Sequence, residues 1–361
     1  MAKQFTDFTF RGKKLSDMKT KYISVDFDSN SDSTNLGMER DMIKGETNRY
    51  RVESNYFYDT WSSPIEYELD IVKDPCEYDT QTKMEISKTE IREFTRWLTS
   101  SHYPEWIHFK DEDGIDEDVR YCGWFSNIET FVAYGTVYGL KLYFKCTSSF
   151  AYTDTISDVA SVNGYLTKLV TNDSDDLDSY CYPTIKIHPN ENGEIFMCNM
   201  SDCTILTQGI FEAGLSDYSN ELLNMVNTYA ENNGYEVKHL GSGAYNYKYV
   251  CNDTAIQVKL VDSFGNSIFC TAFYITTTRE YRIIENGFMF MKVYKDLNIV
   301  MDCENLTIVD NLDRMITYDK LGIDDVGYMY WLRLMNGNNS ILFYGNVDIT
   351  IEHIEKRKVG E

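Results

Sequence analysis

The stretch YMYWLRLMNGNNSILFYGNVDITIEHIEKRKVGE, residues 328–361, alternates apolar and polar side chains around turn-forming residues. Leu332 and Leu334 flank Arg333, and a later run alternates with period two from Val347 to Ile351, as half-buried strands do. The residues Asn-Gly-Asn-Asn at 336–339 tolerate positive φ and therefore predict a tight turn between two strands. The stretch is predicted to be a β-hairpin, and it contains no nucleophile, general base or phosphate-binding loop.

The rest of the chain has the composition of a mainly β protein. It contains 28 Tyr and 19 Phe but only 5 Pro in 361 residues. Tyrosine and phenylalanine suit the pleated, half-buried surfaces of sheets. The length exceeds that of one ordinary domain, so two or three domains are expected.

Shifts in pattern along the chain predict where the domains lie. Residues 1–154 contain alternating strands and one helix, which begins at the capping box formed by Ser87 and Glu90. The polar and acidic residues 155–180 are predicted to connect this domain to a second one at 181–361. Within the second domain, a helix capped near Ser216 and Asp217 and the strands after it predict a small inserted α+β subdomain at about 206–281.

The charge of the chain argues against nucleic-acid binding through phosphate contacts. The formal net charge is −23, whereas proteins that bind phosphate backbones present basic faces. Solubility explains such acidity. A second interpretation is that the negative charge lets DNA pass through a channel without adhering to it.

No pattern for catalysis, metal binding or a cofactor is evident. The nine cysteines form no C-x-x-C pair, the five histidines are isolated, and the G-x-S-x-G motif of nucleophile elbows is absent. The acidic run at 111–118 has only part of a calcium loop and is interpreted as a solvated loop. No signal peptide or membrane span is expected, since the first residues, MAKQFTDFTFRGKK, lack an apolar core. The chain is therefore predicted not to be an enzyme, and a glycan-degrading enzyme is only a remote alternative.

Three tyrosines in the predicted insertion have two interpretations. Tyr245, Tyr247 and Tyr249 have the spacing that places side chains on one face of a strand. Packing within the sheet is the ordinary explanation of this pattern. The alternative is a platform on which a carbohydrate stacks, because tyrosine combines an apolar ring with a polar tip.

Several segments taken in order resemble the phage distal tail proteins, the baseplate or tail-tip hub family of long non-contractile tails. The N-terminal domain of that family resembles FTDFTFRGKKLSDM at 5–18, IEYELDIVKDP at 65–75, EIREFTRWLTSSHYPEWIHFKD at 90–111 and GLKLYFKCTSSFAY at 139–152. Its C-terminal sandwich resembles YPTI at 182–185, WLRLMNGNNSILFYG at 331–345 and DITIEH at 348–353. Residues 206–281 depart from the family pattern.

The resemblance implies a structural virion protein at the phage tail tip, made in the host cytoplasm. It implies a homohexameric ring of N-terminal β-sandwich-like domains between the tail tube protein and the tail-associated hub protein, with DNA passing through the lumen. It further implies an outer galectin-like β-sandwich that anchors receptor-binding proteins, or, as the alternative function, contacts host-wall glycan. Exposed strands suited to a ring place the interface candidates at Phe5, Phe8, Phe10, Ile65, Tyr67, Leu69 and Ile71.

Overall fold

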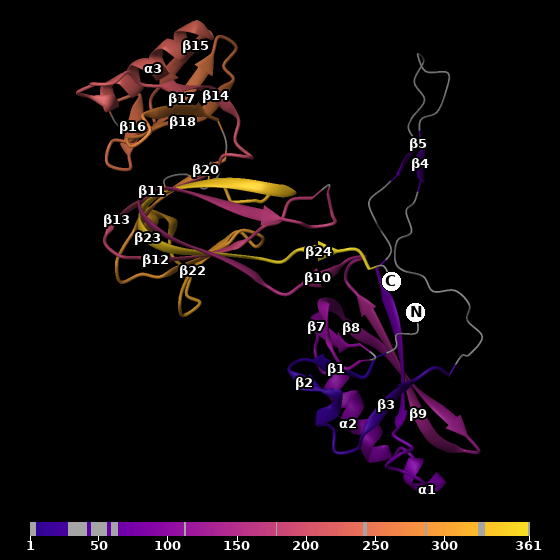
Figure 1. Cartoon of the computed structure of the whole chain (residues 1–361). Helices are drawn as coiled ribbons and strands as arrows, with labels where there is room; N and C mark the ends of the chain where they lie inside the picture. Colours follow the sequence, from indigo (N-terminus) through magenta and orange to yellow (C-terminus); the bar gives the residue numbers. More distant parts are fainter. Residues whose placement is uncertain are drawn as a thin grey trace. The chain divides into compact units, whose positions relative to one another are not determined.

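The computed structural model describes residues 5–27, 42–44, 56–58, 64–111, 113–177, 179–240, 244–285, 287–323 and 329–359 (Figure 1). The chain divides into two compact units: unit 1 comprises residues 1–154 and 355–361, and unit 2 comprises residues 155–354. Antiparallel sheets dominate both units, which confirms the predicted mainly β, sandwich-like fold. No helix among the described residues is long and apolar enough to cross a membrane.

Unit 1 is built on a nine-stranded sheet with the order β2-β1-β7-β8-β9-β6-β3, to which β10 and β24 are added through β8. Its strands are β1 (Asp7–Phe10), β2 (Lys13–Lys14), β3 (Tyr22–Val25), β6 (Glu66–Lys73), β7 (Glu105–Lys110), β8 (Asp116–Ala133), β9 (Thr136–Cys146), β10 (Ala151–Thr153) and β24 (Lys356–Arg357). A separate two-stranded sheet pairs β4 (Met42–Lys44) with β5 (Tyr56–Tyr58). A 3₁₀ turn at Leu15–Asp17 and the short helix α1 (Gln81–Met84) complete the unit with α2.

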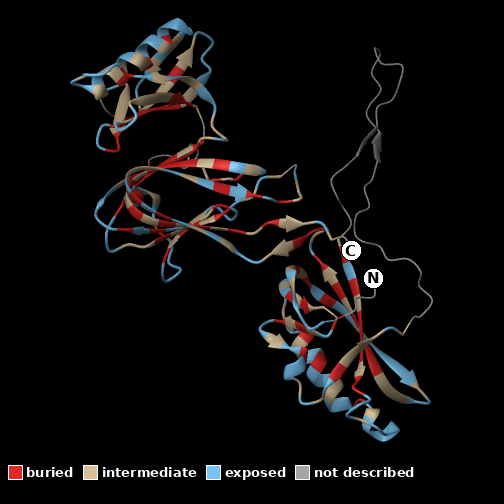
Figure 2. Cartoon of the chain, viewed as in Figure 1, coloured by how far each residue is buried: buried red, intermediate tan, exposed pale blue. Residues whose placement is uncertain are grey.

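Helix α2 (Lys88–Leu98) covers the apolar face of this sheet. Ser87 caps its N-terminus and Glu90 returns the hydrogen bond, as the sequence predicted. Phe94 and Leu98 are buried, and the ring of Trp97 stacks on that of Phe8 at 5.5 Å between centroids. The apolar positions of the strands therefore form one core beneath the helix, which appears as the buried residues in Figure 2.

The Glu90 carboxylate links α2 to the sheet. It accepts hydrogen bonds from Ser87 N at 2.7 Å and Thr20 Oγ1 at 2.8 Å, and it lies 3.0 Å from Lys73 Nζ. Burial opposes ionisation, but the hydrogen bonds from Ser87, Lys73 and Thr20 outweigh it and lower the pKa of Glu90 to about 2. Ionised Glu90 therefore stabilises unit 1.

We expect Glu90→Gln to destabilise unit 1 by about 2 kcal/mol at neutral pH and by much less near pH 2. The folded-state pKa is lower than the ordinary value of 4.5, so the contribution of Glu90 is present above that value and lost as pH falls toward 2. Denaturation of unit 1, followed by hydrogen exchange between pH 2 and pH 7, measures the difference. The exposed Glu93→Gln on the same helix is the control. A deficit that is constant across this pH range would contradict the prediction.

Unit 2 contains a seven-stranded sheet with the order β20-β13-β23-β12-β21-β22, in which β11 pairs with β23. The strands are β11 (Ile156–Asn172), β12 (Thr184–Pro189), β13 (Gly193–Asn199), β20 (Phe288–Val293), β21 (Ile299–Asp302), β22 (Thr307–Asp310) and β23 (Gly337–His353), with a 3₁₀ turn at Tyr318–Leu321. One edge of β23 bonds β11 throughout, while its other edge bonds β13 and then β12. The β11–β23 pair thus has both β13 and β12 as neighbours, and its apolar side chains contribute to the core of this sheet.

The predicted closing hairpin is wrong, because residues 337–353 form one continuous strand. Before it, Leu334 makes only an isolated bridge to Cys181. Within this strand, Gly345 faces Gly164 of β11 in unbroken register. A Cβ at Gly345 would lie 2.9 Å from Ile195 Cγ2. The glycine therefore permits the close approach of β23 to its neighbour β13 in the same sheet rather than a reversal of the chain.

The segment 155–180 also differs from its expected role as a connection. Most of it is β11, which pairs with β23 from Ile156↔His353 to Asn172↔Gly337 and belongs to unit 2. Its partner lies about 180 residues away in the sequence, which is why its polar composition alone suggested a linker.

The inserted subdomain lies between β13 and β20. A six-stranded sheet has the order β14-β19-β18-β17-β15, with β16 beside β17. Its strands are β14 (Ile205–Ile210), β15 (Tyr235–Lys238), β16 (Tyr247–Val250), β17 (Ala255–Asp262), β18 (Ser267–Ile275) and β19 (Glu280–Ile284). Helix α3 (Tyr218–Asn232), capped by Asp217 as predicted, lies over one face of this sheet (Figure 1).

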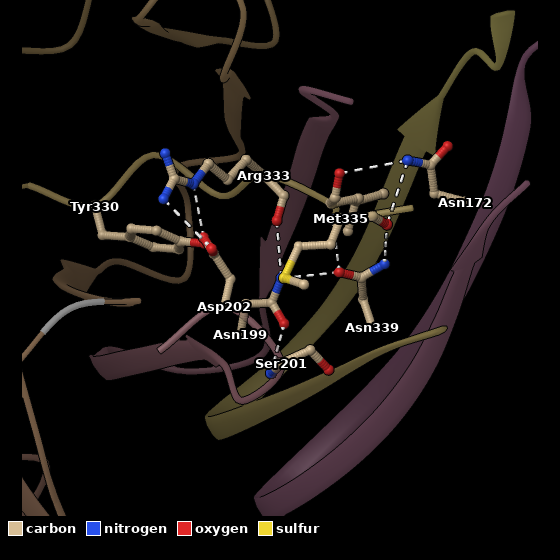
Figure 3. Close-up of polar contacts among 9 residues, drawn as sticks. Asn172, Asn199, Ser201, Asp202, Tyr330, Arg333, Met335 and Asn339 are labelled. Carbon is tan, nitrogen blue, oxygen red and sulfur yellow. Dashed lines mark hydrogen bonds and ion pairs between the residues drawn. The ribbon is translucent and has the colours of Figure 1, made fainter. Parts of the chain in front are cut away.

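A polar network holds the entry loop of this subdomain, residues 199–204 (Figure 3). Asp202 accepts a hydrogen bond from Tyr330 Oη at 2.7 Å and forms an ion pair with Arg333 Nε at 2.6 Å. The Arg333 guanidinium also lies 4.1 Å from the centroid of the Tyr180 ring. The side chain of Asn199 donates to Arg333 O at 2.8 Å. The network therefore fixes where the inserted subdomain leaves the larger sheet.

Candidate binding site

The three tyrosines singled out in the sequence lie together in the inserted subdomain. Strand β16 pairs with β17 in the register Tyr247↔Val258 and Tyr249↔Ile256. This pairing turns both rings toward the face that α3 covers, where they pack against the edge of the subdomain core. Tyr245 precedes the strand and is 68% exposed. The two-residue spacing thus places Tyr247 and Tyr249 on one face of the strand, as expected.

The rings line a cavity of about 570 Å³ whose lining residues are Leu240, Tyr245, Tyr247, Lys248 and Tyr249. The centroids of Tyr245 and Tyr247 are 5.7 Å apart with planes inclined at 38°, and those of Tyr247 and Tyr249 are 5.2 Å apart at 80°. Two orientations of aromatic face are thus presented side by side. The volume is within the range of pockets for small ligands.

Hydrogen bonds hold the platform at its two ends. Tyr249 Oη donates to Ser219 O in the first turn of α3 at 3.3 Å, and burial raises the pKa of Tyr249. At the other end, His239 Nδ1 donates to Tyr245 O at 3.1 Å. The Tyr249 phenol is therefore neutral and anchored, while Tyr245 projects outward. Such a surface offers apolar faces and hydroxyl groups to a ligand.

The polar residues near the platform have structural roles. Asn252 Nδ2 donates to Tyr344 Oη at 3.0 Å, and Asp253 O accepts from Ser219 Oγ at 2.9 Å. Both residues have positive φ in the turn between β16 and β17. Ser242, another polar residue close to the platform in sequence, lies outside the described residues. They shape the surroundings of the cavity rather than line it.

The ring-interface candidates occupy a different place from the one predicted. All seven are between 0% and 4% exposed: Phe5, Phe8, Phe10, Ile65, Tyr67, Leu69 and Ile71. They belong to the core of unit 1, and β6 bonds β9 on one side and β3 on the other. Their side chains therefore cannot face a neighbouring subunit. The alternation in sequence indicated the buried face of the sheet, not an outer one.

The described residues offer no group of three or more His, Cys, Asp or Glu side chains that could hold a metal ion. In the acidic run, Asp111 Oδ1 instead accepts a hydrogen bond from Ile115 N at 2.8 Å, and the residues from Asp116 onward belong to β8. Among the described residues that line the tyrosine cavity there is no Asp or Glu.

Residues 3–148 match the family described as the phage tail protein N-terminal domain. The match covers nearly all of the first segment of unit 1 and confirms the phage tail resemblance found in the sequence. Residues 3–148 are thus similar to the N-terminal domain of phage tail proteins.

Solved structures of baseplate components are also similar to the chain. The SPP1 Dit (gp 19.1) protein, described as a paradigm of the hub adsorption apparatus in phages infecting Gram-positive hosts, has a TM-score of 0.47 and 13% identity, with 98% of this chain and 99% of that chain covered. Chains of the phage P2 baseplate in its activated conformation, with Ca or with Sr, have TM-scores of 0.38 and 8% identity over the same shares. No curated protein matches the chain.

Proposed function

We propose that the protein forms a homohexameric ring at the distal end of the phage tail and has no enzymatic activity. Unit 1 would form the ring and join the tail tube protein to the tail-associated hub protein. Unit 2, as a galectin-like sandwich, would anchor receptor-binding proteins. The observation that carries this proposal is the match of the phage tail N-terminal family to residues 3–148, within a unit that has its own core.

The charge of the chain fits passage of DNA through such a ring. Each copy carries a formal charge of −23, and a closed ring would bring six such copies around one lumen. Negative walls repel the phosphate backbone, so DNA would cross the ring without specific binding. A lumen that is neutral or basic would contradict this part of the proposal.

Two measurements test the ring and its position. Light scattering of the purified chain over a range of concentrations gives its mass, which should be six times the mass of 42.0 kDa for one chain. Gold-labelled antibody against unit 2 should mark the tail tip in electron micrographs of virions. Labelling along the tube or at the head would overturn the proposed position, and a strict monomer would overturn the ring.

A second function is favoured by the tyrosine cavity, namely binding of host-wall carbohydrate through the inserted subdomain. Sugar rings present C–H faces that suit aromatic platforms, and their hydroxyls suit the phenol groups. The two functions are compatible, because a protein at the tail tip meets the cell wall. The tyrosines Tyr245, Tyr247 and Tyr249 are the proposed contacts.

We expect Tyr245→Ala and Tyr247→Ala each to weaken binding of host-wall polysaccharide by about 2- to 10-fold, since one aromatic contact contributes about 0.5–1.5 kcal/mol. Isothermal calorimetry with the purified polysaccharide measures this loss. The exposed Tyr103 of unit 1 provides a matched control as Tyr103→Ala. Undiminished binding by the double variant would exclude the cavity, and release of reducing ends by the unmodified protein would favour a glycan-degrading enzyme instead.

A further inference from the structure

The turn between β8 and β9 carries a residue that its backbone does not favour. Tyr134 and Gly135 both have positive φ, of 50° and 80°, in a tight turn between two strands. Asparagine or aspartate before glycine suits this geometry, whereas a bulky side chain at positive φ is strained. The Tyr134 side chain is 100% exposed, so it gains no burial within the chain. The fold alone gives no reason for tyrosine here.

The residues next to this turn are also apolar and exposed. Phe131 is 41% exposed and Val132 is 52% exposed. Phe131 stacks on Phe27 at 4.4 Å between centroids, which fixes the position of its ring. Phe131, Val132 and Tyr134, hereafter the tip, form a hydrophobic projection supported by two paired strands.

A second exposed aromatic surface spans β7, β8 and β10, on the face opposite the core. Trp106 and Trp124 are 37% and 41% exposed. The Arg120 guanidinium lies 4.2 Å from the centroid of the Trp106 ring, and the Tyr152 ring meets Trp106 edge to face at 5.4 Å. Trp106 is opposite Cys122, so Arg120 and Trp124 flank it diagonally on the same side of the sheet. These four aromatic and guanidinium side chains are hereafter the tryptophan face.

The tip and the tryptophan face are too far apart to form one patch. Val132 follows Trp124 by eight positions, which corresponds to about 26 Å along a strand. One surface projects from a turn, and the other lies on the sheet. Two unlike surfaces on one chain suit a head-to-tail contact between copies, whereas a two-fold contact needs one self-complementary patch.

We propose that the tip of one copy docks on the tryptophan face of the next copy. This inference rests on the proposed ring and names its contact surfaces. Tyr134 would stack on the tryptophan rings and meet the Arg120 guanidinium, which combines aromatic and cation–π attraction. Tryptophan, tyrosine and arginine are the residues in which the binding energy of protein interfaces concentrates. The contact also explains why a strained turn carries tyrosine.

The test uses two variants of the full chain and their mixture. Tyr134→Asn suits the turn and should leave the monomer as resistant to urea as the unmodified chain, or more so. Trp124→Ser removes an exposed ring from the other surface. Each variant alone should remain monomeric by native mass spectrometry at concentrations where the unmodified chain forms rings. Mixed together, they should form heterodimers and nothing larger, because each pair retains one intact tip facing one intact tryptophan face.

The outcomes separate this inference from the ring itself. Rings formed by either folded variant alone, or by the mixture, would overturn the proposed contact and leave the ring standing. An unmodified chain that stays monomeric at every concentration would overturn the ring together with the contact. A benzophenone amino acid at position 134 gives an independent measurement. When rings of the same mass as those of the unmodified chain are irradiated, this amino acid should cross-link to peptides containing Trp106 or Trp124 of another copy. Cross-links confined to other segments would also overturn the contact.

Discussion

Replacing Asn199 by alanine is expected to lower the free energy of unfolding of unit 2 by about 3 kcal/mol. The Asn199 side chain is 0% exposed and is bonded at both ends. Its Nδ2 donates to Arg333 O at 2.8 Å and to Asn339 Oδ1 at 3.2 Å, while its Oδ1 accepts from Ser201 N at 3.1 Å (Figure 3). Alanine would remove these three bonds, of which the one to Asn339 is buried, where a missing bond costs more than it does in water.

The loss of stability should appear first as local opening of the entry loop. That loop connects β13 to the inserted subdomain, and the segment around Arg333 holds it from the other side. Hydrogen exchange of peptides covering residues 196–204 and 330–345 measures the local opening. The exposed Asn338→Ala in the same segment is the matched control and should change stability by less than about 0.5 kcal/mol. Equal protection in both variants would show that the buried amide contributes little.

Local sequence patterns predicted the helices and strands of this fold better than they predicted which strands pair. The capping box at Ser87 and the cap at Asp217 identified both longer helices, because a cap is decided by residues within one turn. The closing segment was misread for the opposite reason. Residues 337–353 form one strand because they pair with β11, which is distant in sequence, so the course of this segment depends on tertiary contacts.

The ring candidates illustrate a second limit of sequence patterns. Alternation from Ile65 to Ile71 shows which side chains are withdrawn from water, but a core and a subunit interface withdraw them equally. Burial of these residues beneath α2 decides between the two. The tip at Tyr134 had the opposite problem, since an exposed aromatic residue at a turn has no periodic pattern. Its unfavourable backbone conformation becomes visible only in the structure.

The tyrosine platform was partly predictable. Spacing alone placed Tyr247 and Tyr249 on one face of a strand, where the structure also has them. The cavity depends in addition on Leu240 and on the first turn of α3, where Tyr249 is anchored at Ser219. Leu240 and Ser219 lie outside β16, so the sequence suggested an aromatic surface but not the cavity.

Removing residues 355–361 is expected to destabilise unit 1 by about 3 kcal/mol while leaving unit 2 folded. This segment returns from unit 2 and completes unit 1, where β24 pairs with β10 in the register Ala151↔Arg357. Thr153 N donates to Glu355 O at 3.0 Å, and Glu355 N donates to Thr153 Oγ1 at 3.1 Å. Val359 packs against the core of the unit, and Ala151 is wholly buried.

Truncation would expose this part of the core and leave the edge of β10 unpaired, which is also a risk for aggregation. Hydrogen exchange distinguishes the units, because peptides from β8 and β10 should lose protection while those from β11 and β23 serve as the internal control. If both units lost protection together, they would unfold as one cooperative body, and the division into two units would not describe their stability. If neither changed, β10 would hold its place without β24.

The expected loss of protection in β10 also has a consequence for the ring, since the tryptophan face includes Tyr152 of β10. Removing β24 should therefore weaken assembly of the ring by disturbing β10, although neither strand belongs to the tip.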